Sequence, residues 1–363
     1  REYLVAAMIK DKLKRLDSIE CRIMYWNRGI YENDIYKYMP NIVMTFPLTI
    51  LPLINLIARI KIICKSQVVS FVTEGYINPN TIDEERWGGY YGFPVELIDY
   101  WCVWGEAYKE LLWKILCKKG RIKNKDKIRV FGYPMWEHTD LQKIKEKNLI
   151  EREIQDLTDI YSNTILILSG FAEANKEKKD VLDSIDAYNE NAEEAKKEYQ
   201  IEKLLKKIEK IKKYRDKYYA LAIDLIEKYP DKLFLLKLHP KEIEGCRDNK
   251  AYDFGKFKQY ENVRVLAEEN AIGTYINKIS ALIHYGSTVA WEAYICHVPT
   301  IRININDEEL SNAYGTYGPG EGFNFNQIEI ISKYIGNLPE AKYVKEYDEY
   351  LLKWFNYDKT KPY

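Results

Sequence analysis

The chain has 363 residues, more than one hydrophobic core usually holds, which fits two domains of about 150 to 200 residues each. Its 55 lysines and arginines equal its 55 aspartates and glutamates, so no overall positive field favours nucleic acid, and an acidic substrate would need a local site. The six cysteines form no C-x-x-C pair, which argues against a zinc site or a disulfide framework and favours the cytoplasm.

The first part of the chain has the pattern of an α/β unit. Residues 4–16 carry apolar side chains near helical spacing, and residues 21–26 are a candidate strand. Residues 42–63 are very apolar, but prolines and the charged Arg59 and Lys61 interrupt them, so we reject a membrane-spanning helix. We expect a buried helix pair there; the alternative is a surface that contacts lipid at the inner face of the membrane.

A candidate strand at residues 68–72 leads into a carboxylate and a glycine turn. Gly75 permits a sharp turn, and this turn would expose Glu74 at the end of the strand. A carboxylate in such a place can act as a general base if it comes within hydrogen-bond reach of the substrate. Glu74 is therefore the candidate base, and the acidic group at residues 83–85 is its competitor.

The polar stretch at residues 142–163 is the predicted domain boundary. Two more short strands, 99–104 and 128–131, precede it, and a new strand follows it. We therefore divide the chain into an N-terminal domain of residues 1–155 and a C-terminal domain of residues 160–342.

The second domain opens with a predicted strand at residues 164–168. The loop after that strand contains Ser169 and Asn175, both candidates for nucleotide binding at the carboxyl end of the strand. Residues 191–229 repeat apolar side chains every three or four positions and predict one long helix. Its charged face is interpreted as solvated surface, because acidic and basic residues alternate along it.

The end of the chain is predicted to contain a strand at residues 299–304 and a glycine-rich loop at residues 315–322. Helical patterns follow at residues 328–335 and 344–355. We expect the C-terminal segment, residues 343–363, to pack back onto the N-terminal domain.

A short apolar run at residues 233–236 ends on Lys237, His239 and Pro240. This run predicts a strand, and open α/β sheets bind ligands at the carboxyl ends of their strands. A lysine and a histidine at one strand end suit a diphosphate or phosphodiester. His239 could hold or protonate a departing phosphate, since its reference pKa is about 6.5. Taken alone, such a histidine is more often structural.

A second phosphate-binding candidate follows the predicted strand at residues 279–283 and precedes a predicted helix at residues 289–295. The turn between them offers backbone N–H groups, hydroxyls and a helix N-terminus to an anion. An ordinary helix N-cap is the simpler interpretation. Glu292, one helical turn further on, could accept hydrogen bonds from a ribose or merely complement the helix end. The candidate nucleotide-binding residues here are His284, Gly286, Ser287, Thr288 and Glu292.

Together these segments resemble the bacterial surface-carbohydrate glycosyltransferases of GT-B architecture that use CMP-activated acidic sugars, such as the Kdo transferases, sialyltransferases and polysialyltransferases. Members of this family carry an acidic-acidic-glycine motif, then a histidine-proline motif, then a serine/threonine motif. Thr73-Glu74-Gly75, His239-Pro240 and Ser287-Thr288 occupy that order here. The resemblance covers residues 68–303, and one departure is that Thr73 stands at the first acidic position.

The resemblance implies two Rossmann-like domains that face a central cleft. It further implies transfer of a Kdo-like or sialic-acid-like sugar from a CMP-sugar co-substrate to a surface glycan or glycolipid acceptor, with Glu74 and His239 as the catalytic residues. The chain contains no Asp-x-Asp, so we expect metal-independent chemistry without a cofactor. Peripheral contact with the membrane would suit such an acceptor.

Three alternatives share these sequence features. A polyol-phosphate transferase that uses CDP-glycerol or CDP-ribitol also carries a histidine-proline pair and a serine-rich turn. A UDP-sugar 2-epimerase shares the fold and needs no second substrate. A catalytically silent lobe that only binds nucleotide or carbohydrate is the alternative outside the enzymes.

Overall fold

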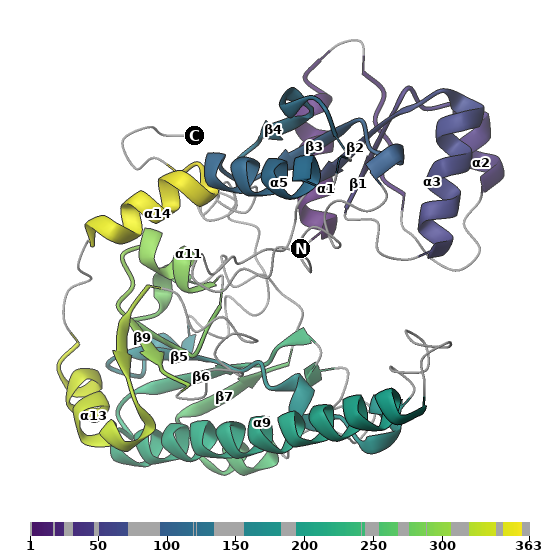
Figure 1. Ribbon diagram of the computed structural model, residues 1–363. Coiled ribbons are helices and arrows are strands. Elements are labelled where there is room, and N and C mark those ends of the chain that lie inside the picture. The colour runs from purple at the N-terminus through teal and green to yellow at the C-terminus, as the bar shows by residue number, and fades with distance from the viewer. Residues whose placement is uncertain are drawn as a thin grey trace. The chain divides into compact units, whose positions relative to one another are not determined.

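The computed structural model contains two compact α/β units (Figure 1). Unit 1 comprises Arg1–Leu141 and Tyr343–Tyr363, and unit 2 comprises Gln142–Lys342. The structure describes residues 2–16, 19–24, 32–46, 51–71, 95–118, 120, 122–133, 156–182, 194–240, 242–243, 254–267, 276–287, 289–305, 319–338 and 344–357.

Unit 1 is built on a four-stranded parallel sheet with the order β1-β2-β3-β4. Its strands are β1 (Ile42–Thr45), β2 (Gln67–Phe71), β3 (Tyr100–Val103) and β4 (Ile128–Val130). Its helices are α1 (Glu2–Leu13), α2 (Glu32–Tyr38), α3 (Leu51–Cys64), α5 (Glu106–Lys118) and α14 (Lys345–Phe355), with short 3₁₀ turns at Val95–Leu97 and Lys125–Lys127. Parallel neighbours need crossover connections, and α3 and α5 provide them between β1 and β2 and between β3 and β4.

The C-terminal helix α14 packs on α5 within unit 1. The ring of Phe355 stacks on Trp104 with centroids 5.3 Å apart, and Tyr133 meets both rings. Gly105 lies directly under the backbone of α14, where a Cβ atom would collide with the carbonyl oxygen of Lys353. A glycine at the start of α5 is therefore needed for this close approach.

Unit 2 is built on a six-stranded parallel sheet with the order β10-β9-β8-β5-β6-β7. Its strands are β5 (Thr164–Leu168), β6 (Leu233–Lys237), β7 (Val263–Leu266), β8 (Ala281–His284), β9 (Thr300–Ile303) and β10 (Glu321–Phe323). The first strand, β5, is central and the chain winds outward from it in both directions. This is the strand order of a Rossmann sheet, with its topological switch point between β5 and β8.

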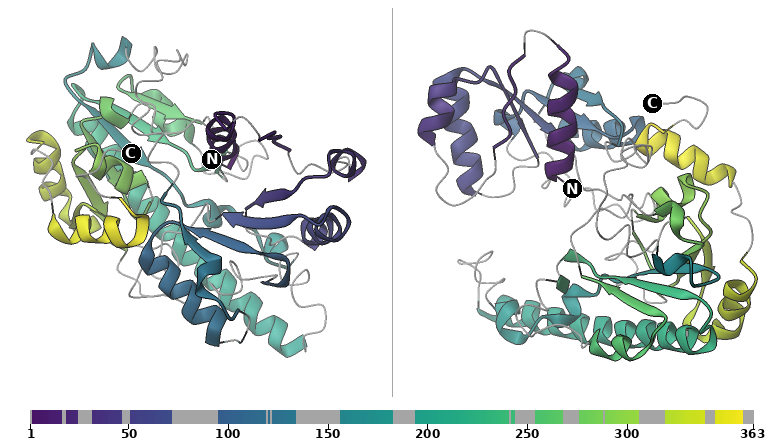
Figure 2. Two further views of the ribbon diagram at one scale, coloured as in Figure 1. Left: turned by 90° about the horizontal axis from the view of Figure 1, so that it is seen from above. Right: turned by 180° about the vertical axis from the view of Figure 1, so that it is seen from behind.

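Helices cover both faces of the sheet of unit 2. Every residue of β5 and β6 is buried, as expected for central strands of a parallel sheet. Ile165 and Ile167 face α9 (Glu194–Lys228), which runs along one face (Figures 1 and 2), while Leu166 and Leu168 pack with α11 (Val289–Ile295) on the other. This alternation of adjacent residues produces the three-layer arrangement.

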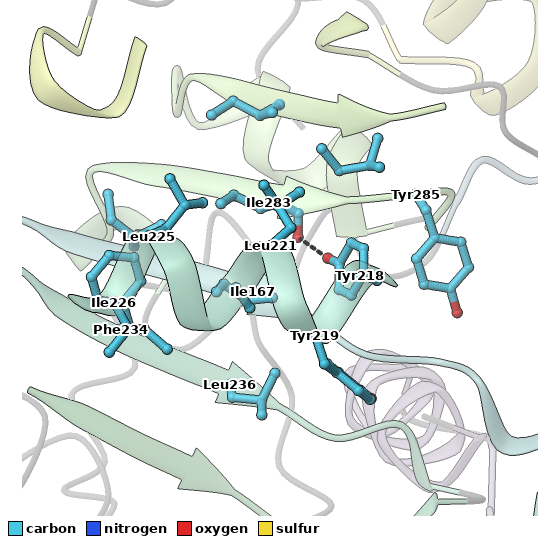
Figure 3. Packing of buried hydrophobic residues seen from close by; sticks show 14 of the residues in the cluster. Ile167, Tyr218, Tyr219, Leu221, Leu225, Ile226, Phe234, Leu236, Ile283 and Tyr285 are labelled. Atoms are coloured by element: carbon cyan, nitrogen blue, oxygen red, sulfur yellow. Dashed lines mark hydrogen bonds between the residues drawn. The ribbon is translucent and has the colours of Figure 1, made fainter. Parts of the chain in front are cut away.

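The core beneath α9 is formed by apolar side chains from the helix and the central strands. Leu221, Leu225 and Ile226 of α9 pack with Ile167 of β5 and Ile283 of β8 (Figure 3). The remaining elements of unit 2 are short 3₁₀ turns at Ala172–Asn175, Phe254–Gln259, Ile276–Lys278 and Phe325–Gln327, and the helix α13 (Ile328–Gly336).

The structure confirms most of the elements predicted for unit 2. Strand β5 has the predicted bounds, α11 covers the predicted residues 289–295, and α9 falls within the predicted helix at 191–229. These segments have strong, unbroken patterns: continuous apolar runs for buried strands, and a three-to-four-residue period for the helix.

The prediction of a helix pair at residues 42–63 is wrong at its start. Ile42–Thr45 forms strand β1, and among the described residues of this segment the helix is Leu51–Cys64. A short apolar run can form either a strand or a helix, and here its pairing with β2 makes it a strand. The described part of the predicted strand at 21–26, residues 21–24, is also not a strand.

Two strands of unit 2 were not predicted. Val263–Leu266 alternates Val-Arg-Val-Leu and is only four residues long, so it gives a weak signal. Glu321–Phe323 contains a glycine, and its first two residues belong to the segment predicted as a loop, residues 315–322. Pairing with β9 makes it a strand, which no local pattern indicates.

None of the described helices has both the length and the apolar character required to cross a membrane.

Candidate functional site

The candidate site residues that the structure describes all belong to unit 2. Glu74, the neighbouring Thr73 and Gly75, and the acidic group at residues 83–85 lie outside the described residues, as does Thr288. The role of Glu74 as a base and that of Thr288 in nucleotide binding therefore stay predictions.

Three loop segments leave the same edge of the sheet, at the carboxyl ends of β8, β5 and β6. These strands are adjacent, and their register places Leu168 beside Lys237 and Ile167 beside Ile283. The switch point of the sheet lies between the first two of these strands. In open α/β sheets this is where ligands bind.

The segments after β5 and β6 are joined by hydrogen bonds. The backbone N–H of Ser169 donates to the carbonyl of Lys237 over 3.0 Å, and the backbone N–H of His239 donates to Ser169 Oγ over 3.0 Å. Ser169 Oγ also lies within bonding distance of the Lys237 carbonyl and of the Glu242 carboxylate. The side chain of His239 is exposed, whereas Lys237 is buried with 8% of its surface accessible.

Glu242 is a buried carboxylate that sequence analysis missed. It is 1% exposed and accepts hydrogen bonds from the backbone N–H groups of Phe171 (3.0 Å) and His239 (3.1 Å). Burial raises the pKa of Glu242, and the hydrogen bonds from Ser169, His239 and Phe171 oppose that rise.

A sequence signal for Glu242 was present. The chain turns helical at Pro240, and the backbone N–H groups of Glu242 and Ile243 both donate to the carbonyl of His239. His239 thus occupies the N-cap position, Pro240 the first helical position and Glu242 the third, where a glutamate commonly reaches back to the N-cap N–H. The His-Pro-x-Glu spacing could have predicted this bond.

The segment after β8 packs against the segment after β5. The ring of Tyr285 stacks on Phe171 with centroids 4.4 Å apart. A Cβ atom at Gly170 would collide with the Tyr285 hydroxyl, so a larger residue there would require the stacked Tyr285 ring to move. The hydroxyl of Tyr218 on α9 is shared between the carbonyls of Leu168 (3.0 Å) and Ile283 (3.2 Å), which ties the ends of β5 and β8 together. Figure 3 shows the bond to Ile283.

Ser287 stands just before α11. Its Oγ accepts the backbone N–H of Val289 over 3.2 Å, which is the local capping role considered from the sequence. That bond uses the oxygen and leaves the O–H hydrogen for an acceptor such as a phosphate. Gly286 precedes it at the same edge of the sheet, and Glu292 of α11 is buried at 2% exposure. Their roles toward a nucleotide remain predictions.

Asn175 lies at the end of the 3₁₀ turn after β5 and is held by the long helix. Arg215 of α9 donates from Nη1 to Asn175 Oδ1 over 3.2 Å. The amide oxygen is thus engaged within unit 2, and nucleotide binding by Asn175 stays a prediction.

His284, the last residue of β8, is fully buried. Its Nε2 lies 3.1 Å from the carbonyl of Pro319, an acceptor, so Nε2 carries the hydrogen and donates it. Burial lowers the pKa of His284 to about 4, and the charge of Arg302 on β9 acts in the same direction. The neutral ring therefore fastens the segment before β10 to the sheet, and its contact with a nucleotide stays a prediction.

A stability difference between neutral and acidic pH follows from His284. The unfolded chain protonates His284 near pH 6.5, whereas the folded protein does so only near pH 4. The free energy of unfolding is therefore highest above about pH 6.5 and falls as the pH is lowered through about 4. We expect the free energy of unfolding to fall by roughly 3 kcal/mol more in the wild type than in His284→Gln between pH 7 and pH 4. Chemical denaturation of both proteins at several pH values measures this. Parallel pH profiles would contradict it.

Among the described residues there is no group of three or more histidine, cysteine, aspartate or glutamate side chains that could hold a metal ion.

No protein-family model matches the chain, and no curated protein matches it. Solved structures do match. UDP-GlcNAc 2-epimerase from Methanocaldococcus jannaschii is 17% identical with a TM-score of 0.50, covering 94% of this chain and 86% of that one. UDP-GlcNAc 2-epimerase from Neisseria meningitidis bound to UDP-GlcNAc is 15% identical, with a TM-score of 0.46 and coverage of 92% and 72%. The wall teichoic acid polymerase TagF is 12% identical, with a TM-score of 0.43 and coverage of 81% and 65%.

Proposed function

We propose a function for this chain, which has a GT-B-type fold of two parallel-sheet, Rossmann-like α/β units, as predicted from the sequence. A fold of this kind hosts many reactions, so the function has to be argued from the site.

We propose that the protein is an enzyme that binds a nucleotide sugar at the segments following β5, β6 and β8 and acts on the sugar. One observation carries the proposal: Ser169, His239 and Glu242 are hydrogen-bonded to one another at the carboxyl edge of the sheet, beside its switch point. This is where an open α/β sheet binds a ligand. The exposed His239 and the hydroxyl of Ser287, whose hydrogen is not used in its bond with the Val289 N–H, match the needs of a phosphate.

A UDP-sugar is the first substrate to test, and inversion at C2 of UDP-GlcNAc is the first reaction. The likeness of fold to a UDP-GlcNAc 2-epimerase over most of both chains supports this choice. The 2-epimerase alternative considered from the sequence therefore takes precedence over the CMP-sugar transferase. His239 would stabilise charge that develops on the phosphate, and a carboxylate such as Glu74 would serve as the base.

Transfer of an acidic sugar from a CMP-sugar to a glycan or glycolipid is the second candidate. The order of the motifs Thr73-Glu74-Gly75, His239-Pro240 and Ser287-Thr288 along the chain favours it.

The two candidates differ in their hydrogen chemistry. A non-redox inversion at C2 removes the hydrogen from that carbon and replaces it from solvent, whereas transfer breaks the bond at the anomeric carbon and needs an acceptor. We therefore propose incubating the full chain with UDP-GlcNAc in D₂O and following the sugar by proton NMR. Gain of deuterium at C2 without an acceptor supports the epimerase.

The same incubation with CMP-activated acidic sugars tests the second candidate. Release of CMP that depends on an added glycan acceptor would support a transferase and overturn the epimerase proposal. If no nucleotide sugar is consumed or bound under any condition, the nucleotide-sugar function itself is wrong.

Activity is expected to survive chelation. The chain has no Asp-x-Asp, and Lys237 and His239 can offset phosphate charge from the protein side. Turnover measured with and without EDTA should agree within about twofold. Complete loss in EDTA, restored by magnesium or manganese, would overturn this prediction.

A further inference from the structure

We propose that Glu242 is a positioning residue: its buried carboxylate fixes the backbone of the His239 segment against the segment after β5, and so sets the place of the His239 imidazole. The inference deepens the proposed function and rests on it for the role of His239.

The carboxylate of Glu242 accepts four hydrogen bonds, from donors on different parts of unit 2. Oε1 accepts the N–H of Phe171 (3.0 Å) and the hydroxyl of Tyr219 (3.3 Å), and Oε2 accepts the N–H of His239 (3.1 Å) and the hydroxyl of Ser169. These donors come from the segment after β5, the segment after β6 and the helix α9. One side chain therefore links three separate elements at the site.

Two of the four donors to Glu242 are backbone N–H groups, which can only donate. A hydroxyl such as that of Tyr219 or Ser169 can rotate and accept instead, but the N–H groups of Phe171 and His239 cannot. A carboxylate offers an oxygen to each of them. An amide at the same position has one oxygen, so its NH₂ group would face either Phe171 N–H or His239 N–H.

The hydrogen bonds of Glu242 are buried. Glu242 is 1% exposed, so water does not readily replace a lost bond, and a buried donor without an acceptor is destabilised. His239, whose backbone N–H bonds to Glu242, has an exposed side chain. A shift of the His239 backbone is therefore transmitted directly to a ring that stands at the carboxyl edge of β6.

The test uses four variants of the full chain. Glu242→Gln removes one acceptor and keeps the side-chain volume. Tyr219→Phe is the matched control, because it removes the longest of the four bonds and leaves both backbone bonds in place. His239→Ala and the double variant Glu242→Gln/His239→Ala complete a double-mutant cycle. Circular dichroism and thermal unfolding establish that each variant is folded.

The first measurement needs no substrate. The chain has four histidines, and the imidazole signals of His239 are identified by their loss in His239→Ala. Glu242→Gln should shift the NMR signals of the His239 ring, while Tyr219→Phe leaves them at the wild-type positions. Unshifted His239 signals in folded Glu242→Gln would overturn the proposal.

The second measurement separates positioning from general stability. We expect Glu242→Gln to lower kcat/KM about tenfold to a hundredfold in the wild-type background and less than about threefold in the His239→Ala background. Equal factors in both backgrounds would mean that Glu242 does not act through His239, and the proposal would fail.

Misfolding of a variant and failure of the proposed function would each give a distinct result. If Glu242→Gln does not fold, Glu242→Asp replaces it in the NMR experiment, since the shorter side chain draws the carboxylate away from the N–H groups of Phe171 and His239; unshifted His239 signals there overturn the proposal. If the wild type binds and consumes no nucleotide sugar, the proposed function is wrong, while the NMR measurement still decides whether Glu242 positions His239.

Discussion

His239→Ala is expected to lower turnover of the nucleotide sugar by about 10² to 10⁴, the range for a positioned acid or base. The ring is exposed at the carboxyl edge of β6, on a backbone that Ser169 and Glu242 hold in place. It can therefore meet a phosphate and stabilise or protonate it as the bond to the sugar breaks. Steady-state kinetics of the wild type and the variant measure the effect.

His297→Asn is the control for that variant. His297 is exposed and follows α11 with a φ of 59°, a conformation that asparagine also adopts, so the substitution preserves the backbone. It should leave turnover within about twofold of the wild type. If His239→Ala also retains wild-type turnover, His239 has only a structural role and does not stabilise or protonate the phosphate.

Glu74→Gln is expected to reduce turnover to near the background rate, by about 10² to 10⁴, with little change in nucleotide affinity. The expectation rests on the sequence: Glu74 belongs to the first half of the chain, whereas the nucleotide segments belong to unit 2. Loss of a base lowers kcat without removing a contact to the nucleotide. Kinetics and calorimetric titration with the nucleotide measure the two quantities separately.

Persistent turnover in Glu74→Gln would contradict its role as the base and make the acidic group at residues 83–85 the next to test. A joint loss of affinity and turnover would place Glu74 in nucleotide binding or in folding. Far-UV circular dichroism of the variant distinguishes those two results.

The sequence predicted the parts of the site that depend on strand ends. The apolar runs of β5 and β6 fix where the strands stop, and in a parallel sheet these stops lie at one edge. Ser169 and His239 were therefore expected near each other, and the structure shows a 3.0 Å hydrogen bond between them.

The sequence did not reveal the contacts that depend on packing of distant elements. Glu242 is reached by Tyr219 from a helix and by Phe171 from another strand end, and no local pattern predicts which elements meet. The hydrogen bond of His284 is a second contact of this kind. Its place after an apolar run suggested a ligand contact, whereas its ring is hydrogen-bonded to Pro319 on a distant segment and is buried with the rest of β8.

A crystal structure of the full chain with UDP bound tests the central claim most directly. The account predicts that the phosphates lie within hydrogen-bond distance of the segments that follow β5, β6 and β8, with the His239 ring and the Ser287 hydroxyl among their contacts. UDP bound elsewhere on unit 2, or on unit 1 alone, would contradict it.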